Sequence, residues 1–418
     1  MPRLAQTVRV VGCGATKLGN RLGRSAGSLM AEAVQGALSS ARLELDDLDG
    51  LIAVPSMSDP HLMEAHYLAT KIGLLPKKNF LVRTIDTGGA GPVTALLEGR
   101  RMIEAENCQA VVIAAGDAVS SLSTEEFLRR ADAGIGCDRL PSPAIPNGYG
   151  LITDWHAKTY GVTREQLAKV PCLMSHQASK HPHAITRRRY TVEEVLESPQ
   201  ITPQLNLLEC ARRMDGAGAI IVASSRFLEK RGLLNKGNHG NGDVVILSGG
   251  EASGPLSPPV VIDETMFSCE QAAQSAYYEA QVRPDEIDFF GLYDCFPICF
   301  LRAIEAVGIC PKGQGGRWID EQYERILADE NYVLPVNTHG GLLSFGAPWE
   351  APAIFAVIEA VRQLNGVAGA QQVAEDCRRA LVYGNGGIFS SSAVAILSKP
   401  IQFNKTQAAA GVASSPKL

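Results

Sequence analysis

Short apolar runs alternate with longer amphipathic segments along the first part of the chain. Runs rich in Val, Ile and Leu predict strands at 8–11, 51–54, 81–85 and 110–115. Apolar side chains that recur every three or four positions predict helices at 28–42 and 93–106. Strands that alternate with helices in this way are typical of an α/β fold, in which helices pack on a mostly parallel sheet.

The same alternation returns in the last part of the chain. Predicted strands lie at 244–247, 287–291, 380–383 and 393–397, and predicted helices lie at 268–281, 298–307 and 351–364. The segment between the two ordered parts is rich in proline and charge, which favours a loop-rich insertion over one face. We therefore divide the chain into an N-terminal half (1–116), an insertion (117–241), a C-terminal half (242–402) and an Ala/Ser/Lys-rich tail that we expect to be disordered (403–418).

The two ordered parts resemble one another. An acidic stretch leads into a strand at 45–51 and again at 284–290. A glycine-rich turn, a long helix and an apolar strand follow one another at 88–115 and again at 340–383. This repetition predicts a duplicated domain, with a site at the junction where loops of both halves meet.

Composition narrows the class of protein. The 418 residues carry a net charge of −5, which gives no broad electrostatic reason to bind nucleic acid or an anionic membrane. No stretch approaches the roughly 18 apolar residues of a spanning helix, and Met1 leads into a strand-like run without a signal peptide. The ten cysteines show no paired spacing, which favours reduced thiols in a cytoplasmic protein. Cys295 and Cys299 form the closest pair, and no second pair completes a metal site.

Four segments carry a recognisable set of motifs. They are Tyr293-Asp294-Cys295-Phe296, the segments 175–184 and 210–219, and the segment 337–348, which reads Asn-Thr-His-Gly-Gly-Leu-Leu-Ser-Phe-Gly-Ala-Pro. In this order they resemble the motifs of sterol-carrier-protein-type thiolases, among them His-Asp-Cys-Phe and Asn-x-x-Gly-Gly…Gly-His-Pro. The resemblance covers nearly the whole chain. It implies the thiolase fold, a duplicated five-layer αβαβα architecture that is usually dimeric and acts on acyl-CoA thioesters.

The catalytic residues of that family are replaced at three positions. Aligning 93–96 with the family's Ser-Thr-Ala-Leu places Gly89, or Gly88 with a one-residue gap, where the nucleophilic cysteine is expected. The activating histidine of Gly-His-Pro is Ala347, and the histidine of His-Asp-Cys-Phe is Tyr293. Covalent acyl transfer has therefore lost both its nucleophile and the base that activates it.

The retained loops and the new phenol fit another reaction of the same thioester. Retro-aldol cleavage of a 3-hydroxyacyl-CoA also forms a thioester enolate, but it needs only a base for the β-hydroxyl proton and an acid for the α-carbon. We expect a lowered pKa to let Tyr293 act as that base. The pattern also resembles certain bacterial steroid side-chain aldolases, which are thiolase-like and work with a small zinc-containing OB-fold partner. The resemblance implies release of acetyl- or propionyl-CoA with a ketone or aldehyde.

Other motif residues are candidates for the site, and each has a structural alternative. Cys295 is a candidate for proton transfer at the α-carbon or a small buried side chain. His339 is a candidate oxyanion donor or acid–base residue, and otherwise a structurally bonded histidine. Asn337 is a site candidate that otherwise shapes its turn, whereas Asp294 is expected to orient neighbouring backbone. Backbone N–H groups for an oxyanion pocket, or simply tight turns, are expected at Gly89, Gly341 and Gly386.

A basic run in the insertion is the candidate site for the phosphates of CoA. Arginine suits phosphate through its planar fork of donors, and the resembling segment binds CoA in thiolases. The alternative is a solvated run of charges. We expect no cofactor other than CoA as part of the substrate. The candidate residues are Lys180, His183, Arg187, Arg188 and Arg189.

Two other functions stay open. The chain could be a non-catalytic thiolase-like subunit that scaffolds a partner or completes a heteromeric thiolase. It could also be an atypical acyl-CoA acyltransferase with Cys295 as nucleophile, which predicts a trapped acyl-enzyme.

Overall fold

The computed structural model describes residues 7–234 and 244–400. Its main feature is a nine-stranded mixed sheet with the order β3-β2-β4-β7-β1-β8-β11-β10-β9. The first part of the sheet holds β1 (Val8–Ala15), β2 (Gly50–Ala53), β3 (Leu81–Thr84), β4 (Ala110–Ala118) and β7 (Asp215–Ser224). The second part holds β8 (Val244–Ser253), β9 (Phe289–Leu292), β10 (Arg379–Gly386) and β11 (Ser391–Ser398). The predicted tail 403–418 lies outside the described residues.

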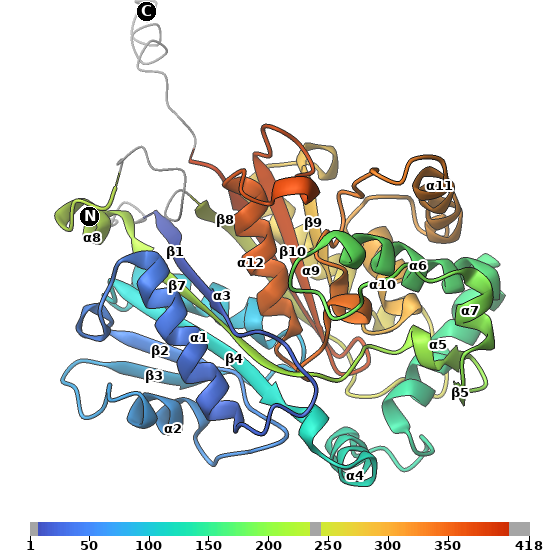
Figure 1. Ribbon diagram of the computed structural model, residues 1–418, viewed down its shortest axis with the longest axis horizontal. Helices are drawn as coiled ribbons and strands as arrows, with labels where there is room; N and C mark the ends of the chain where they lie inside the picture. Colours follow the sequence, from blue (N-terminus) through green and yellow to red (C-terminus); the bar gives the residue numbers. More distant parts are fainter. Residues whose placement is uncertain (1–6, 235–243, 401–418) are drawn as a thin grey trace, which may run out of the picture.

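Helices cover the outer faces of the sheet and fill the space between its two parts (Figure 1). In the first half α1 and α2 pack on the outside, and in the second half α9 and α10 do so. Between the two parts lie α3 and α12, which contact each other and strands of both halves. The layers therefore run α–β–α–β–α, which confirms the predicted five-layer α/β fold. The bounds are α1 (Ala26–Ala41), α2 (Glu64–Lys71), α3 (Gly91–Ala105), α9 (Cys269–Ala280), α10 (Pro297–Ala306) and α12 (Pro352–Leu364).

The burial of each helix follows its place in these layers. An outer helix has one apolar stripe, and α1 buries Leu29, Ala33, Ala37 and Ala41 along one face. A helix between two sheets must be apolar on nearly all sides, and α12 is buried at almost every position from Pro352 to Leu364. The largest hydrophobic cluster accordingly lies around the two central helices.

The two halves repeat the same order of elements. Strands β2-β4-β7-β1 in the first half correspond to β9-β10-β11-β8 in the second. Short 3-10 turns at Leu45–Asp47 and Pro284–Glu286 lead into β2 and β9, and glycine turns precede α3 and α12. Even the place of the edge strand β3 has a counterpart, because Val336 forms a parallel bridge to Phe290 beside β9. Both repeats that the sequence shows are therefore confirmed.

A pair of aspartates explains why the acidic stretches recur. Asp49 accepts hydrogen bonds from the backbone N–H of Gln109, at 2.8 Å, where the chain enters β4. At the equivalent place Asp288 accepts one from the N–H of Arg379, at 2.9 Å, where the chain enters β10. Each carboxylate thus joins its own strand to the next strand of the sheet.

The segment between β4 and β7 is mainly helical and not loop-rich as predicted. Its helices are α4 (Thr124–Ile135), α5 (Ala144–Tyr160), α6 (Arg164–Lys180) and α7 (Val192–Glu197), followed by the small hairpin of β5 (Gln200–Thr202) and β6 (Leu205–Asn206). Periodicity fails in α6 because it is buried nearly all round over its second half. N-cap hydroxyls that mark helix starts were present at Ser123, Thr163 and Thr191.

Most of this helical segment covers the second half, whereas α4 contacts the first half through Arg130, which donates to the backbone oxygens of Met57 and Ser58. Figure 1 shows α5, α6 and α7 beside α10 and α11 (Gly315–Ala328), and α6 also packs on the loop 341–345. The predicted range 117–241 also includes β7, which pairs with both β4 and β1. The segment outside the sheet therefore ends before Asp215, where the first half resumes; β7 then leads into α8 (Ser225–Lys230).

Candidate active site

Loops of both halves meet where the chain leaves β9 and β10 and enters α3. The turn at 87–89 lies directly against Gly386 and Gly387, backbone on backbone. Gly88 has φ +60°, and a Cβ there would be only 2.9 Å from the Cα of Gly386. Only glycine allows this approach, and it brings the start of α3 next to the end of β10.

Tyr293 fills the space above Gly89. A Cβ added at Gly89 would lie 2.1 Å from the Tyr293 hydroxyl oxygen and 2.5 Å from the backbone oxygen of Asn385. Residue 89 is the position where the thiolase resemblance expects a nucleophilic cysteine. The missing nucleophile and the added phenol are therefore one structural change, because the phenol takes the place that the cysteine side chain would need.

The electrostatic environment of Tyr293 differs from the prediction. Its side chain is only 7% exposed. Burial first, and then the neighbouring Cys295 and Glu350, raise the pKa of the Tyr293 phenol well above its ordinary value. The predicted lowering of this pKa is wrong, because a motif shows residue types but not the burial around them. A neutral phenol is a hydrogen-bond donor and an acid, and not a base.

Asp294 holds the loop that follows Asn337. Its Oδ1 accepts a hydrogen bond from the backbone N–H of Leu342 at 2.7 Å. The carboxyl group also occupies the space where a Cβ of Gly341, at φ +60°, would stand. Burial raises the pKa of Asp294 to about 7. The side chain thus orients neighbouring backbone and sits close to its titration point at neutral pH.

Asn337 and His339 lie under the same loop. The Asn337 side chain is fully buried and binds both backbone groups of Leu292, accepting from its N–H at 2.7 Å and donating to its oxygen at 2.8 Å. This fixes the backbone immediately before Tyr293. His339 packs edge-on against Phe345, and burial lowers its pKa to about 3, so its imidazole is neutral.

Cys295 is half-buried at the entrance to α10. Its thiol lies close to the Tyr149 hydroxyl and to the thiol of Cys299. The backbone oxygen of Cys295 accepts from the N–H of Ala211, which ties this motif to the segment 210–219.

Three residues near Tyr293 were not predicted from the sequence: Tyr149, Asn385 and Glu350. Tyr149 and Asn385 hydrogen-bond to each other, with 2.7 Å between the Asn385 Nδ2 and the Tyr149 hydroxyl oxygen. Glu350 is half-buried, and burial followed by Asp86 and Asp117 raises its pKa to about 8. Glu350 could have been found, since it closely follows the Gly-Ala-Pro motif. Tyr149 lies in the helical insertion, far from every motif in the sequence.

The predicted CoA-binding cations lie on the segment that borders the site loop. Backbone N–H groups of Ile185 and Thr186 donate to the oxygens of Phe345 and Ser344, at 3.2 and 3.0 Å. The basic run therefore starts beside the loop that Asp294 holds.

The cations of this segment have separate local partners. Lys180 Nζ donates to the Tyr332 oxygen at 3.2 Å, and burial lowers the Lys180 pKa. The remaining contacts are Arg187 to the His181 oxygen (2.8 Å), Arg188 to Glu194 (2.7 Å), Arg189 to the Glu330 oxygen (3.1 Å) and the His183 N–H to His181 Nδ1 (3.2 Å). No shared anion cradle is formed by these five side chains.

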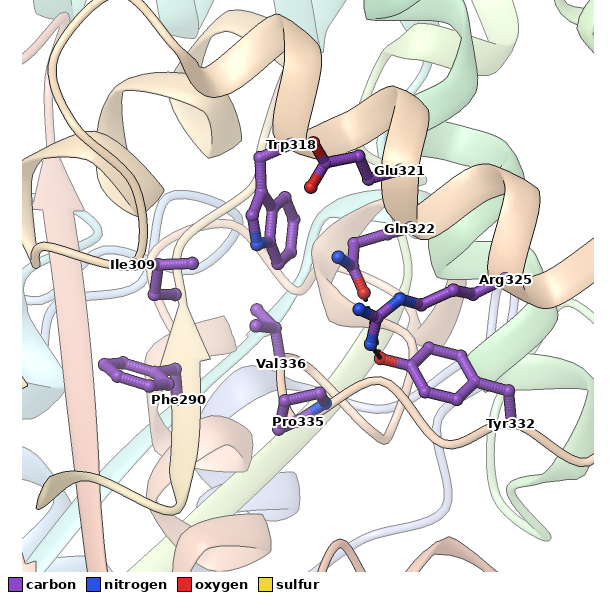
Figure 2. Close-up of a pocket in the computed structure, with 9 residues that line it drawn as sticks. All are labelled: Phe290, Ile309, Trp318, Glu321, Gln322, Arg325, Tyr332, Pro335 and Val336. Atoms are coloured by element: carbon purple, nitrogen blue, oxygen red, sulfur yellow. Dashed lines mark hydrogen bonds between the residues drawn. The ribbon is translucent and has the colours of Figure 1, made fainter. Parts of the chain in front are cut away.

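Two cavities of the described residues lie away from Tyr293. One, of about 280 Å³, lies between α11 and the segment 332–336, and Figure 2 shows Phe290 and Val336 on one side of it and Trp318 on the other. The Tyr332 hydroxyl donates to Gln322 at 2.9 Å at its rim. A second, of about 590 Å³, is lined by α2 and by residues 61–63 just before it. None of the predicted site residues lines either cavity.

Residues 7–234 and 244–400 hold no group of three or more His, Cys, Asp or Glu side chains arranged for a metal ion. None of their helices combines the length and the apolar character that crossing a bilayer requires.

Comparisons with known proteins agree with this geometry. Residues 260–399 match the family described as thiolase C-terminal domain-like. The acetyl-CoA acetyltransferase of Methanothermobacter thermautotrophicus is 30% identical over 408 residues, covering 94% of this chain and 99% of that protein. Sterol carrier protein 2 of Bos taurus is 30% identical over 236 residues, which are 56% of this chain and 42% of that longer protein.

Solved structures share the fold along the whole chain. The Ltp2-ChsH2(DUF35) aldolase superposes with a TM-score of 0.79 at 23% identity, covering 96% of this chain and 100% of that one. Human mitochondrial 3-ketoacyl-CoA thiolase gives a TM-score of 0.69 at 15% identity, covering 95% and 100%. The chain therefore belongs to the thiolase superfamily and is of its sterol-carrier-protein type.

Proposed function

We propose that this chain is a carbon–carbon lyase that cleaves a 3-hydroxyacyl-CoA by a retro-aldol reaction. The products are acetyl- or propionyl-CoA and a ketone or aldehyde. The observation that carries the proposal is the Tyr293 phenol in the space above Gly89. A site with this arrangement has no nucleophile at position 89, and it retains a proton donor beside the loops that surround a thioester in thiolases.

The reaction needs two proton transfers. A base takes the β-hydroxyl proton, the electron pair of the Cα–Cβ bond moves to Cα, and a carbonyl forms at Cβ. The thioester enolate that results is protonated at Cα. The raised pKa of Tyr293 suits the donor in this second step or the hydrogen bond to the enolate oxygen. Glu350, with its pKa raised to about 8 and its charge felt by Tyr293, is the base we propose.

The surroundings of the site suggest how a thioester is held. We assign the CoA phosphates to the basic segment beside the site loop, at Lys180, His183, Arg187, Arg188 and Arg189. CoA enters as part of the substrate, and the reaction as written uses no further cofactor or metal. A homodimer is part of the proposal, as is a steroid side chain for the acyl group.

A partner protein is also part of the proposal. The structural neighbour with the TM-score of 0.79 is described as an aldolase complex of Ltp2 with ChsH2(DUF35). We propose that this chain works with a small, zinc-containing OB-fold protein of that kind.

Two observations favour other functions. The phenol is tightly packed and only 7% exposed, which fits a relic site in a non-catalytic subunit. The archaeal relative is named an acetyltransferase. The half-buried Cys295 is the candidate nucleophile for an acyltransferase reaction.

A product assay separates the three. The purified chain, with and without an OB-fold partner, is incubated with 3-hydroxyacyl-CoAs, including steroid ones, and no free CoA. Mass detection of acetyl- or propionyl-CoA together with the carbonyl product supports the lyase, because thiolysis would consume CoA. Product only after free CoA is added, or an acylated Cys295 in the intact mass, supports the acyltransferase. Thioester binding without product under all conditions supports the non-catalytic subunit.

A further inference from the structure

Tyr149 links the helical insertion to the wall of the candidate site. It lies in α5 and is 1% exposed. Its hydroxyl donates to the backbone oxygen of Gly387 at 2.9 Å and accepts from Asn385 Nδ2 at 2.7 Å. Both hydrogen bonds end on the segment where β10 runs into its turn, so one hydroxyl holds this segment at two points.

The segment that Tyr149 holds is the one that faces the Tyr293 phenol. The backbone oxygen of Asn385 and the Tyr293 hydroxyl both lie within 2.5 Å of the point where a Cβ of Gly89 would be. The Asn385 side chain is fixed from its other side as well, since its Oδ1 accepts from the Tyr383 hydroxyl at 3.2 Å. A shift of the β10 end would therefore change the surroundings of the phenol.

Further contacts of Tyr149 reach the motif that carries Tyr293. The Tyr149 ring packs on Phe296 with 4.7 Å between centroids. Its hydroxyl also lies close to the Cys295 thiol. Tyr149 thus contacts two residues of the Tyr-Asp-Cys-Phe motif and the strand end opposite it.

We propose that Tyr149 is a positioning residue for Tyr293. This inference rests on the proposed function for its effect on turnover. The Tyr149 hydroxyl fixes the distance between the Asn385–Gly387 segment and the phenol, and so keeps the phenol in one orientation toward the reacting carbon. A reaction that depends on a placed proton donor is sensitive to displacements of about 1 Å, which can cost up to about 100-fold in rate.

A purely structural tyrosine provides the matched control. The Tyr277 hydroxyl in α9 donates to the Val307 oxygen at 2.7 Å, away from the loops of the site. Tyr149→Phe and Tyr277→Phe each remove one hydrogen-bonded hydroxyl, from a buried tyrosine in α5 and from a half-buried tyrosine in α9. Both variants are expected to lose similar stability in urea, about 1–2 kcal/mol, and only Tyr149→Phe should change the site.

Two readouts test the proposal. In steady state, Tyr149→Phe is expected to lower kcat about 10-fold with KM within about twofold, while Tyr277→Phe keeps both. In protein labelled with 13C at the tyrosine ζ-carbon, the Tyr293 resonance is identified by its loss in Tyr293→Phe. It should shift in Tyr149→Phe and stay in place in Tyr277→Phe. Asn385→Ala should shift it too, and the double variant Tyr149→Phe/Asn385→Ala should lose no more kcat than the worse single variant.

The NMR readout separates this proposal from the lyase function. If no protein, wild type included, turns over any thioester, the lyase proposal fails while the resonance still reports on the position of Tyr293. An unchanged Tyr293 resonance in both Tyr149→Phe and Asn385→Ala overturns the positioning role. So does a kcat loss that is equal in Tyr149→Phe and Tyr277→Phe. If Tyr149→Phe does not fold, Asn385→Ala decides by the same resonance.

Discussion

Equivalent glycine turns precede the two central helices, and they differ in what they support. Thr87-Gly88-Gly89 leads toward α3, and Thr338-His339-Gly340-Gly341 leads toward the loop before α12. Tyr293 fills the space above Gly89, and its neighbour Asp294 fills the space above Gly341. Two adjacent side chains of one motif therefore each fill the space above a glycine, one in each half of the duplicated fold.

The difference lies in the chemistry of the two side chains. Asp294 binds the backbone of its own loop through Leu342, so it serves the structure of the second half. Tyr293 crosses to the first half, where the family's nucleophile would stand. The comparison shows that each half supplies a glycine turn, and we propose that the turn lying across the junction from the motif is the reaction site.

The largest expected effect comes from adding one methyl group at Gly89 in one variant and at Gly341 in another. Gly89→Ala should displace the phenol and lower turnover by about 100-fold or more, and its clash with the Asn385 backbone oxygen should also cost stability. Gly341→Ala, at φ +60°, should instead lower the free energy of unfolding by about 2–4 kcal/mol. A product assay measures turnover, and urea unfolding measures the free energy of unfolding of each variant. Equal effects of both variants on both quantities would contradict the division of roles.

The next effect concerns the proposed base. Activity should rise as pH increases through about 8, because the Glu350 carboxylate forms there. Glu350→Gln should lower kcat by about 10- to 100-fold and remove that limb of the pH profile. The raised pKa also means that the folded state holds the Glu350 proton more tightly than the unfolded chain. Stability should therefore fall as pH rises from about 4.5 to about 8, and this fall should be smaller in Glu350→Gln. A pH profile unchanged by the substitution would exclude Glu350 as the base.

A smaller effect tests the equivalence of the halves away from the site. Asp49→Ala and Asp288→Ala each leave backbone N–H groups without their carboxylate acceptor, so each should cost about 1–3 kcal/mol of stability. Both variants should keep the wild-type KM when they are assayed below their unfolding transitions. A loss in one variant and none in the other would show that the repeat is not energetically equivalent.

The smallest effect concerns the basic segment. Arg189→Ala should raise the KM for a CoA thioester about fivefold, in line with the roughly 1 kcal/mol of an exposed charge interaction. The KM for the matching N-acetylcysteamine thioester, which lacks the nucleotide phosphates, should not change. A rise for both substrates would place the effect of Arg189 elsewhere.

The repeat made the scaffold predictable from the sequence. The acidic stretches before 51 and 290 and the glycine turns before the central helices are local patterns, and each formed the element it predicts. The insertion was not predictable in the same way, because α6 is buried nearly all round and shows no one-sided period. Its N-cap residues carried the only local signal, for example Thr163 with Gln166.

The sequence predicted which motif residues lie at the site better than it predicted their protonation states. The family motifs predicted that Tyr293, Asp294 and Asn337 lie together, because residues at matching motif positions are expected at matching places in the fold. The direction of the Tyr293 pKa shift depends on burial, which no tetrapeptide reveals. Tyr149 reaches the site from a helix more than a hundred residues upstream, and only the folded chain shows that contact.

The most direct measurement is the turnover of Tyr293→Phe on a cleavable 3-hydroxyacyl-CoA without free CoA, compared with wild type and Tyr277→Phe. Phenylalanine keeps the ring above Gly89 and removes only the hydroxyl. Product formation should fall at least about 100-fold in Tyr293→Phe, with thioester affinity and unfolding close to those of Tyr277→Phe, which should turn over like wild type. Wild-type turnover in Tyr293→Phe would contradict the role of the phenol as the proton donor of this site.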